Sequence, residues 1–256
     1  MSRPLWFVWA LRHLFPGRFL MAWATRLPGL GHAVERLLFA DDDLMLVPNL
    51  ARGPRTLAVN QTVPAPEQVV VATELVEHFI RAAGVRWIMN DCICRKSASC
   101  EHYPVDLGCL FLGDAAEGIN PALGRPVSEA EALAHARRAR EAGLVHLIGR
   151  NKLDTVWLGV GPAHRLLTLC HCCECCCLWR MLPQISPRIG DKITRMPGVS
   201  VQTTERCVGC GGCSVVCFVD AIELGQHRAT ITQACRGCGR CVTTCPEAAI
   251  ELTVEH

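Results

Sequence analysis

The sequence lacks the short motifs that mark most nucleotide-dependent and hydrolytic enzymes. It has no Walker phosphate-binding loop, no G-x-G-x-x-G dinucleotide fingerprint and no G-x-S-x-G nucleophile elbow, which argues against the usual nucleotide, flavin and hydrolase functions. It also lacks an excess of one charge, because 26 basic and 24 acidic residues give a formal net charge of +2. Nucleic-acid binding needs a broad basic surface, so no nucleic acid is expected as a partner.

An unbroken apolar run of membrane-spanning length is missing as well. Residues 5–23 are rich in apolar and aromatic side chains, but four residues interrupt them: Arg12, His13, Pro16 and Arg18. An export signal or a spanning helix needs an unbroken apolar core, which for a spanning helix is about 20 residues long. Neither is expected here.

The N-terminal segment, residues 1–47, has instead the composition of an amphipathic, aromatic helix. Three tryptophans stand beside four arginines within residues 1–26, a mixture typical of helices at a membrane surface. The alternative is a helix that packs on the chain's own core or on a partner subunit. This alternative is favoured, because apolar helix faces usually pack on protein, and peripheral membrane docking is the second interpretation.

Cysteine is abundant, with 18 residues in 256, and the cysteines cluster in short runs. A chain of this length can bury a core without disulfides. Adjacent thiols such as Cys172 and Cys173 would pair wrongly in an oxidising compartment, whereas a reducing cytosol keeps them free to bind metal. The pattern therefore predicts metal sites in a cytoplasmic protein.

Helical and extended patterns alternate through the middle of the chain. A helix is expected from Glu67 to Ala83, and a second from Ser128, which forms a capping box with Glu131, to Ala142. Four short apolar runs are expected to be strands: Val85–Ile93, Leu144–Gly149, Val156–Val160 and Leu166–Leu169. The alternation indicates an α/β-type domain within an α+β chain.

Proline and glycine divide the chain into five expected parts. After the N-terminal segment come a linker, a Cys-rich α/β domain, a second linker and a C-terminal domain. Their ranges are 1–47, 48–66, 67–182, 183–198 and 199–256.

The C-terminal region contains an internal duplication. Residues 207–224 and 235–252 match at ten of eighteen positions when they are aligned at an offset of 28. Each half carries the spacing C-x2-C-x2-C-x3-C. Three thiolates spaced in this way lie on one tight loop and can bind three corners of an iron-sulfur cubane, so the fourth ligand must come from elsewhere.

This spacing resembles that of the bacterial ferredoxins with two [4Fe-4S] clusters. The resemblance implies a ferredoxin-type domain in which the fourth ligand of each cluster comes from the other repeat. One cluster would be held by Cys207, Cys210, Cys213 and Cys245, and the second by Cys235, Cys238, Cys241 and Cys217. Phe218 departs from the family, which usually has a proline there, as at Pro246, but no ligand is lost. A pair of zinc knuckles is the alternative, and the duplication and the absence of histidine disfavour it.

Ten cysteines remain outside the repeat. They are Cys92, Cys94, Cys100, Cys109, Cys170, Cys172, Cys173, Cys175, Cys176 and Cys177. The combination of a C-I-C-R motif, a C-x-C-C-x-C-C-C motif and a two-cluster ferredoxin domain resembles a family of 4Fe-4S binding proteins of anaerobic or microaerobic bacteria and archaea. The resemblance implies iron-sulfur character for the chain after the first linker, and no particular reaction.

The grouping of these ten thiols is open from the sequence. The first four could supply a third cluster, with Arg95 and Lys96 offsetting part of its charge. On a helix, four of the later ones would share a face: Cys172, Cys173, Cys176 and Cys177. The two motifs could bind separate centres or share one, the metal could be iron-sulfur or zinc, and some thiols could be free in the core. His171 is expected to be scaffold and not a ligand.

Two functions follow. The first is an electron-transfer protein or subunit that relays single electrons through the two C-terminal clusters to redox partner proteins, with a further iron-sulfur centre in the N-terminal half. The alternative is a reductase whose substrate-binding metal centre lies in that half, and the surplus of thiols favours it. A redox sensor is disfavoured, because no recognition element for nucleic acid is seen.

Overall fold

The structure is a computed structural model that describes residues 2–49 and 67–254. The chain is α+β, as expected. Its centre is a seven-stranded sheet in the order β4-β2-β3-β6-β5-β1-β7. The strands are β1 (Asp43–Val47), β2 (Arg86–Met89), β3 (Leu110–Leu112), β4 (Gly124–Pro126), β5 (Val145–Arg150), β6 (Leu167–Cys172) and β7 (Ile193–Arg195). All neighbours are antiparallel except β1 and β7, which are parallel.

The sheet reaches beyond the expected range 67–182 at both ends. Strand β1 comes from the N-terminal segment, and β7 comes from residues 183–198, which the sequence marks as a linker. The two strands pair with each other, and the backbone N–H of Met196 continues the pairing to the carbonyl of Leu46 at 3.3 Å. Most of the other expected linker, 48–66, lies outside the described residues.

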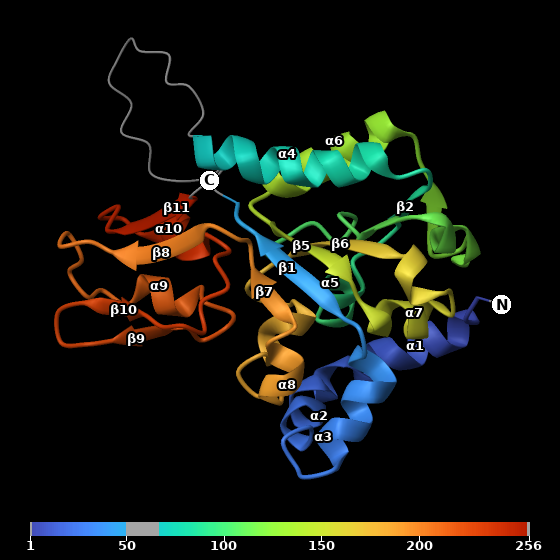
Figure 1. Ribbon diagram of the computed structural model, residues 1–256, viewed down its shortest axis with the longest axis horizontal. Coiled ribbons are helices and arrows are strands. Elements are labelled where there is room, and N and C mark those ends of the chain that lie inside the picture. Colours follow the sequence, from blue (N-terminus) through green and yellow to red (C-terminus); the bar gives the residue numbers. More distant parts are fainter. Residues whose placement is uncertain (1, 50–66, 255–256) are drawn as a thin grey trace.

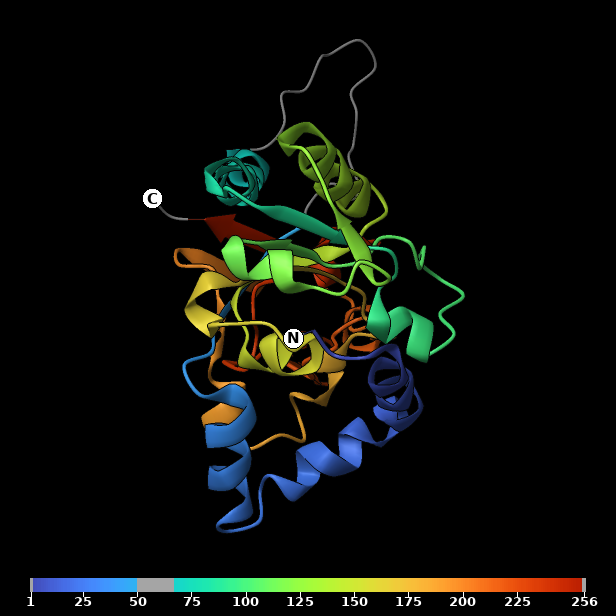
Figure 2. The same cartoon turned by 90° about the vertical axis from the view of Figure 1, so that its right-hand side faces the viewer.

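Helices α4 (Glu67–Ala82) and α6 (Glu129–Glu141) cover one face of the sheet (Figure 2). Both were expected. Helix α6 begins with the predicted capping box, in which Ser128 Oγ accepts from the N–H of Glu131 and the Glu131 carboxylate accepts from the N–H of Ser128. Ile80 and Ala132 from these helices pack on Leu110 and Leu169 of the sheet.

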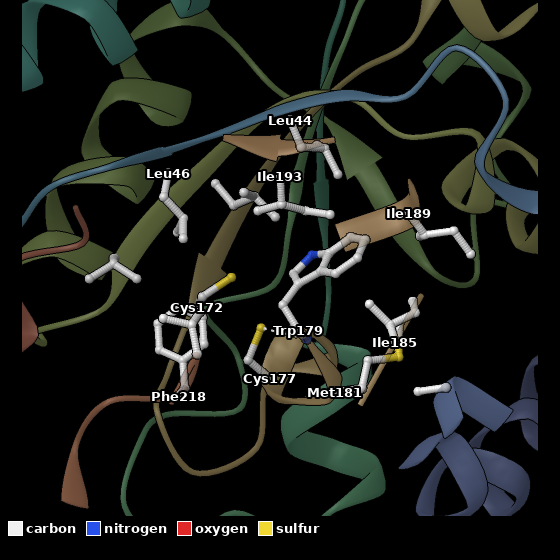
Figure 3. Packing of buried hydrophobic residues seen from close by; sticks show 14 of the residues in the cluster. Leu44, Leu46, Cys172, Cys177, Trp179, Met181, Ile185, Ile189, Ile193 and Phe218 are labelled. Carbon is white, nitrogen blue, oxygen red and sulfur yellow. Dashed lines mark hydrogen bonds between the residues drawn. The ribbon is translucent and has the colours of Figure 1, made fainter. Parts of the chain in front are cut away.

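The opposite face is covered mainly by the N-terminal helices and by short helices of the second half (Figure 1). They are α1 (Leu5–Leu14), η1 (Phe15–Gly17), α2 (Arg18–Ala24), α3 (Leu30–Val34), η2 (Glu35–Phe39), α7 (Lys152–Leu158), η4 (Ala163–Arg165), η5 (Leu178–Met181) and α8 (Pro187–Gly190), while α5 (Ile93–Ser97) and η3 (Asp114–Gly118) flank β2 and β3. In Figure 3, Trp179 and Ile189 pack beneath Leu44 and Ile193. Within the described residues, no helix has the length and apolar character needed to cross a membrane.

Two of the expected strands differ in the structure. Residues 156–160, expected as a strand, belong largely to α7, which Asn151 caps by accepting from the N–H of Leu153 and which ends at the left-handed Gly159. The run 85–93 forms the shorter strand β2, and Ile93 already begins α5. For α7, the caps at Asn151 and Gly159 decide the outcome over apolar content.

The C-terminal residues form a small domain beside the β7 edge of the sheet (Figure 1). Its strands are β8 (Val199–Thr203), paired with β11 (Ile250–Val254), and β9 (Ile222–Leu224), paired with β10 (Ala229–Ile231). Its helices are α9 (Gly212–Val215) and α10 (Arg240–Thr244). The duplication is visible in the backbone, since Gly211 and Gly239 precede these helices with the same φ of 79°, a conformation that glycine adopts without strain.

Candidate metal centres

The first C-terminal set is the group Cys207, Cys210, Cys213 and Cys245. These four line one small cavity, together with glycines of the first loop and Ala249. Cys245 follows α10 in the second repeat, so it meets three thiols of the first repeat. Backbone N–H groups point at two of the sulfurs, from Ala229 to Cys207 at 3.4 Å and from Ala249 to Cys245 at 3.3 Å. The N–H groups of Ala229 and Gly209 lower the pKa of Cys207, which favours a thiolate.

The second C-terminal set is the group Cys217, Cys235, Cys238 and Cys241. Cys217 comes from the first repeat, and its charge acts on each of the other three thiols. Cys217 accepts from the N–H of Ala221 at 3.3 Å, which repeats the contact of Ala249 with Cys245. Burial raises the pKa of Cys238 to about 12, so a thiolate there needs a positive centre such as a metal ion beside it.

The two sets differ in exposure. In the first set Cys210 is exposed, and the neighbouring Val215 is 84% exposed. The second set instead faces the rest of the protein, because Cys217, Cys235 and Cys238 pack against the core cluster that contains Cys172 and Cys177 of the N-terminal half. Phe218 lies in that cluster, beside Cys172 and Cys177 in Figure 3.

A six-cysteine cavity lies under the N-terminal helices. Six of its cysteines belong to no other group and give the cavity its name: Cys92, Cys94, Cys109, Cys170, Cys172 and Cys177. A seventh, Cys173, also borders the cavity, but its sulfur gathers with those of Cys100, Cys175 and Cys176 in the group described below. The sheet brings them together: β3 pairs with β6, which places Cys109 beside Cys170 with their sulfurs 3.6 Å apart. The cavity has a volume of about 320 Å³. Its remaining lining is mostly apolar and includes Leu11 and Phe15 from the N-terminal helices.

Alternation along β6 separates its residues. Cys170 and Cys172 face the cavity, whereas the ring of His171 lies between histidines, with its Nδ1 2.9 Å from His146 Nδ1 and its centroid 5.1 Å from that of His135 on α6. Burial lowers the pKa of His146 to about 3, so the pair is neutral. His171 borders the cavity as well, but its ring is in contact with the other two histidines, which agrees with a scaffold role.

Two cations face the cavity. Arg95 is fully buried, and its guanidinium donates to the carbonyls of Pro104 at 2.9 Å, of His171 at 2.7 Å and of Leu107. Burial lowers the pKa of Arg95, but thiolates at Cys92, Cys173 and Cys109 raise it by more. No carboxylate pairs with Arg95 among the described residues.

An unpaired buried charge is costly, so Arg95 needs the negative charge of thiolates. Lys96, expected to play the same part, is instead paired with Asp91 at the surface. The second cation at the cavity is Arg18 of α2, whose guanidinium stacks on Phe15 and Phe19 at 4.2 and 4.3 Å. Sequence reasoning treated Arg18 only as an interruption of an apolar run.

The tetrathiol group is the set Cys100, Cys173, Cys175 and Cys176. All four sulfurs lie within 4.8 Å of one another, and those of Cys100 and Cys175 are 3.7 Å apart. The expectation of a helical face is wrong, because residues 173–177 form a turn between β6 and η5. That turn brings the sulfurs of Cys173 and Cys176 to the tetrathiol group, and it leaves Cys172 and Cys177 at the six-cysteine cavity, which Cys173 borders as well. Cys100 likewise parts from Cys92, Cys94 and Cys109.

Three residues that the sequence did not single out join this group to the C-terminal domain. Arg240 of α10 contacts the Glu174 carboxylate and the Tyr103 hydroxyl, each at 2.7 Å, and Tyr103 donates to Glu174 at 2.9 Å. Arg240 also donates to the carbonyl of Gly143 at 2.7 Å. All three lie within three residues of a cysteine in the sequence, which is the one signal that could have drawn attention to them.

Comparison with known protein families finds a match for one region of the chain. Residues 201–223 match the family described as 4Fe-4S binding domain, a stretch that contains Cys207, Cys210, Cys213 and Cys217. No curated protein and no solved structure matches the chain. The chain therefore carries a 4Fe-4S binding domain in its C-terminal region, and its other cysteines form a separate assembly in the N-terminal half.

Proposed function

We propose that this chain is an iron-sulfur electron-transfer protein that relays single electrons through two [4Fe-4S] clusters, held by the first and second C-terminal sets. The observation that carries the proposal is the meeting of Cys245 with Cys207, Cys210 and Cys213 at one cavity. The last three lie within residues 201–223, which match a 4Fe-4S binding domain. When bound, a [4Fe-4S] cluster takes up and releases one electron.

The chain's own residues fit this chemistry. The thiols of each set come from both repeats, and backbone N–H groups of Ala221, Ala229, Gly237 and Ala249 donate to their sulfurs. Such bonds stabilise negative charge and tune the potential of an iron-sulfur centre. So many unpaired thiols require a reducing compartment, and we place the protein in the cytoplasm.

A further iron-sulfur centre belongs in the six-cysteine cavity. Arg95 supports it, because this buried cation has thiolates as its only described source of negative charge. Four of the six thiols would suffice for a cubane. The cavity is also in packing contact with the second C-terminal set through the core cluster of Cys172, Cys177 and Phe218.

These contacts give an order to the relay. The first set lies at the surface, because Cys210 is exposed and so are the apolar residues Val208 and Val215 of the same repeat. Exposed apolar side chains of this kind suit a transient contact with a redox partner protein. The second set lies behind it and touches the N-terminal half. Electrons would therefore pass between a partner at the first set and the six-cysteine cavity.

The test is iron, sulfide and zinc quantification of the anaerobically purified full chain, with EPR spectra before and after dithionite. We expect about twelve irons per chain, from three clusters of four. Cys172→Ser/Cys177→Ser should lower this by about four, whereas Cys175→Ser/Cys176→Ser, which alters the tetrathiol group without touching the cavity lining, is the matched control and should not. An iron content of eight per chain that the first variant does not lower would contradict the third centre. A chain without iron would refute the whole proposal.

A reductase is the second candidate function, and the cavity favours it. Six thiols exceed the four that a cubane needs, and the buried carboxyl group of Asp154, whose pKa burial raises, lies at the cavity wall, where it could deliver a proton. A centre that binds substrate has an open iron position. Cyanide added to the reduced protein should then change the EPR spectrum of the N-terminal centre, and an unchanged spectrum would favour simple electron transfer.

We also propose that the outer face of α1 and α2 docks on a membrane surface. The inner face packs on the protein through Val8 and Ala22, as the favoured expectation required. Three tryptophans nevertheless point outward, with Trp6 68%, Trp9 62% and Trp23 54% exposed, and tryptophan suits the boundary between lipid and water. The full chain should co-sediment with anionic vesicles, and the triple Trp→Ser variant should not. A contact with a partner subunit would leave both in solution.

A further inference from the structure

The geometry points to a zinc site, distinct from the iron-sulfur centres, at the tetrathiol group of Cys100, Cys173, Cys175 and Cys176. This inference does not depend on the proposed electron transfer. It assigns to these four residues one tetrahedral Zn²⁺ ion with a structural role.

The spacing of the sulfurs carries the argument. Four thiolates on one zinc ion at about 2.3 Å form a tetrahedron whose edges are about 3.8 Å long. The sulfurs of Cys100 and Cys175 are 3.7 Å apart, and all four lie within 4.8 Å of one another. The thiolates of a cubane each bind a different iron atom, so they are spread more widely.

The same chain supplies an internal comparison. The eight cysteines of the C-terminal sets have the spacing of cubane ligands, and four of them lie in residues 201–223, which match a 4Fe-4S binding domain. Yet no three of them approach one another as closely as the tetrathiol group does, which is the one such group within the described residues. The structure thus draws the tetrathiol sulfurs to the span of a single ion and leaves the others at a wider span.

The ligand set also fits a closed, structural site. Four soft thiolates in a tetrahedron select zinc or iron, and a site with four protein ligands leaves no position for substrate. Cys173 and Cys176 are buried, and the turn that carries Cys175 is fixed by Arg180, which donates to the carbonyl of Cys175 at 2.8 Å. Nothing in this arrangement calls for a change of oxidation state.

The role of the ion follows from what stands beside the ligands. Glu174 lies between Cys173 and Cys175, and Tyr103 follows Cys100 by three residues. Both hold Arg240, which lies between Cys238 and Cys241 of the second C-terminal set. One zinc ion would thereby hold together the two segments of the N-terminal half that carry Tyr103 and Glu174. In that position both residues contact Arg240 of the C-terminal domain.

The experiment measures zinc and iron in the full chain, purified anaerobically from cells grown with both metals. We expect one zinc per chain. Cys175→Ser/Cys176→Ser, at two ligands that do not border the six-cysteine cavity, should reduce zinc at least tenfold and leave iron unchanged, whereas the matched control Cys172→Ser/Cys177→Ser, which alters the neighbouring thiols, should keep its zinc. The assignment would be overturned if the wild-type chain held no zinc, or if the first variant lost iron.

A second measurement covers the case in which the first variant fails to fold. Wild-type protein grown with cobalt in place of zinc should show the visible absorption of tetrahedral cobalt bound to four thiolates, with its iron content unchanged. Absence of that absorption would overturn the site. Failure of the proposed electron transfer would appear in the iron content and EPR spectra, so the two outcomes are distinguishable.

Discussion

The two cysteine-rich regions of this molecule are built by different means. In the C-terminal domain, three thiols of each set come from one short loop and helix, and only the fourth crosses between repeats. In the N-terminal half, each group needs segments far apart in the chain, such as Cys109 and Cys170, which meet because β3 pairs with β6. The first region depends on local backbone conformation, and the second depends on the integrity of a sheet.

A substitution inside the sheet, at a residue that is no metal ligand, should test this difference most strongly. A side chain at Gly149 would collide with the carbonyl of Asp43, and its φ of 146° disfavours other residues. Gly149→Ala should therefore break the pairing of β5 with β1 and cost about 3 kcal/mol or more. We expect metal loss from the N-terminal half, measured by metal content and EPR, with the C-terminal clusters retained.

Gly84→Ala is the matched control, because a methyl group there meets nothing within 4 Å. It should leave the unfolding free energy within about 0.5 kcal/mol. Equal loss of metal from both regions in Gly149→Ala would show that the two regions are not independent.

The crossing of the fourth ligand can be tested by combining variants. Cys245→Ser should remove one cluster, or about four irons. Adding Cys207→Ser should remove no further iron, because both belong to the first set, whereas adding Cys235→Ser should remove the second cluster too. Iron content and EPR of each double variant give the result, and the reverse pattern would place each set within its own repeat.

The buried cation should matter only to the N-terminal half. Arg95→Gln removes a charge that faces Cys92, Cys109 and Cys173 and leaves three buried carbonyls with fewer donors, at a cost of about 2–4 kcal/mol. Iron in the six-cysteine cavity should fall, and its potential should become more negative. Lys96→Gln, next to it but exposed and paired with Asp91, should change the unfolding free energy by under about 1 kcal/mol.

The smallest effect is expected where α7 joins the sheet. Burial raises the pKa of Asp42 to about 6, although its Oδ1 accepts from the N–H of Lys152 at 2.7 Å. In the unfolded chain it ionises near 4, so the ionised form destabilises the fold above pH 6. Asp42→Asn should therefore raise the unfolding free energy at pH 7.5 by about 1 kcal/mol, and the gain should vanish as pH falls toward 4.

Chemical denaturation across this pH range provides the measurement, and Asp43→Asn, at the exposed neighbouring position, is the control. The gain should help the N-terminal half retain metal and leave the C-terminal clusters as they are. A gain that persists at pH 4 would point to packing instead of charge.

The contrast between local conformation and long-range pairing also explains which parts of the fold and of the metal sites could be predicted from the sequence. The repeat spacing predicts eight ligand positions in the C-terminal region, four of which lie in residues 201–223, the stretch that matches a 4Fe-4S binding domain. Capping and periodicity predicted α4 and α6. The division of the other ten cysteines was out of reach, because it depends on the pairing of β3 with β6 and on the turn after Cys172. That turn sends the neighbours Cys172 and Cys173 to different groups, which no periodic pattern encodes. Strand β7 was missed because its pairing with β1 is long-range.

The departure at Phe218 has a consequence for the duplicated domain. Its counterpart Pro246 lies exposed on the far repeat, whereas Phe218 is buried against Cys172 and Cys177. If the two repeats had identical surroundings, an electron could leave the domain equally well from either cluster. Because Phe218 packs on the N-terminal half and Pro246 faces solvent, the two repeats have different surroundings. The duplicated domain therefore has one end that faces the protein and one end that faces solvent, and this difference gives electron transfer through it a direction.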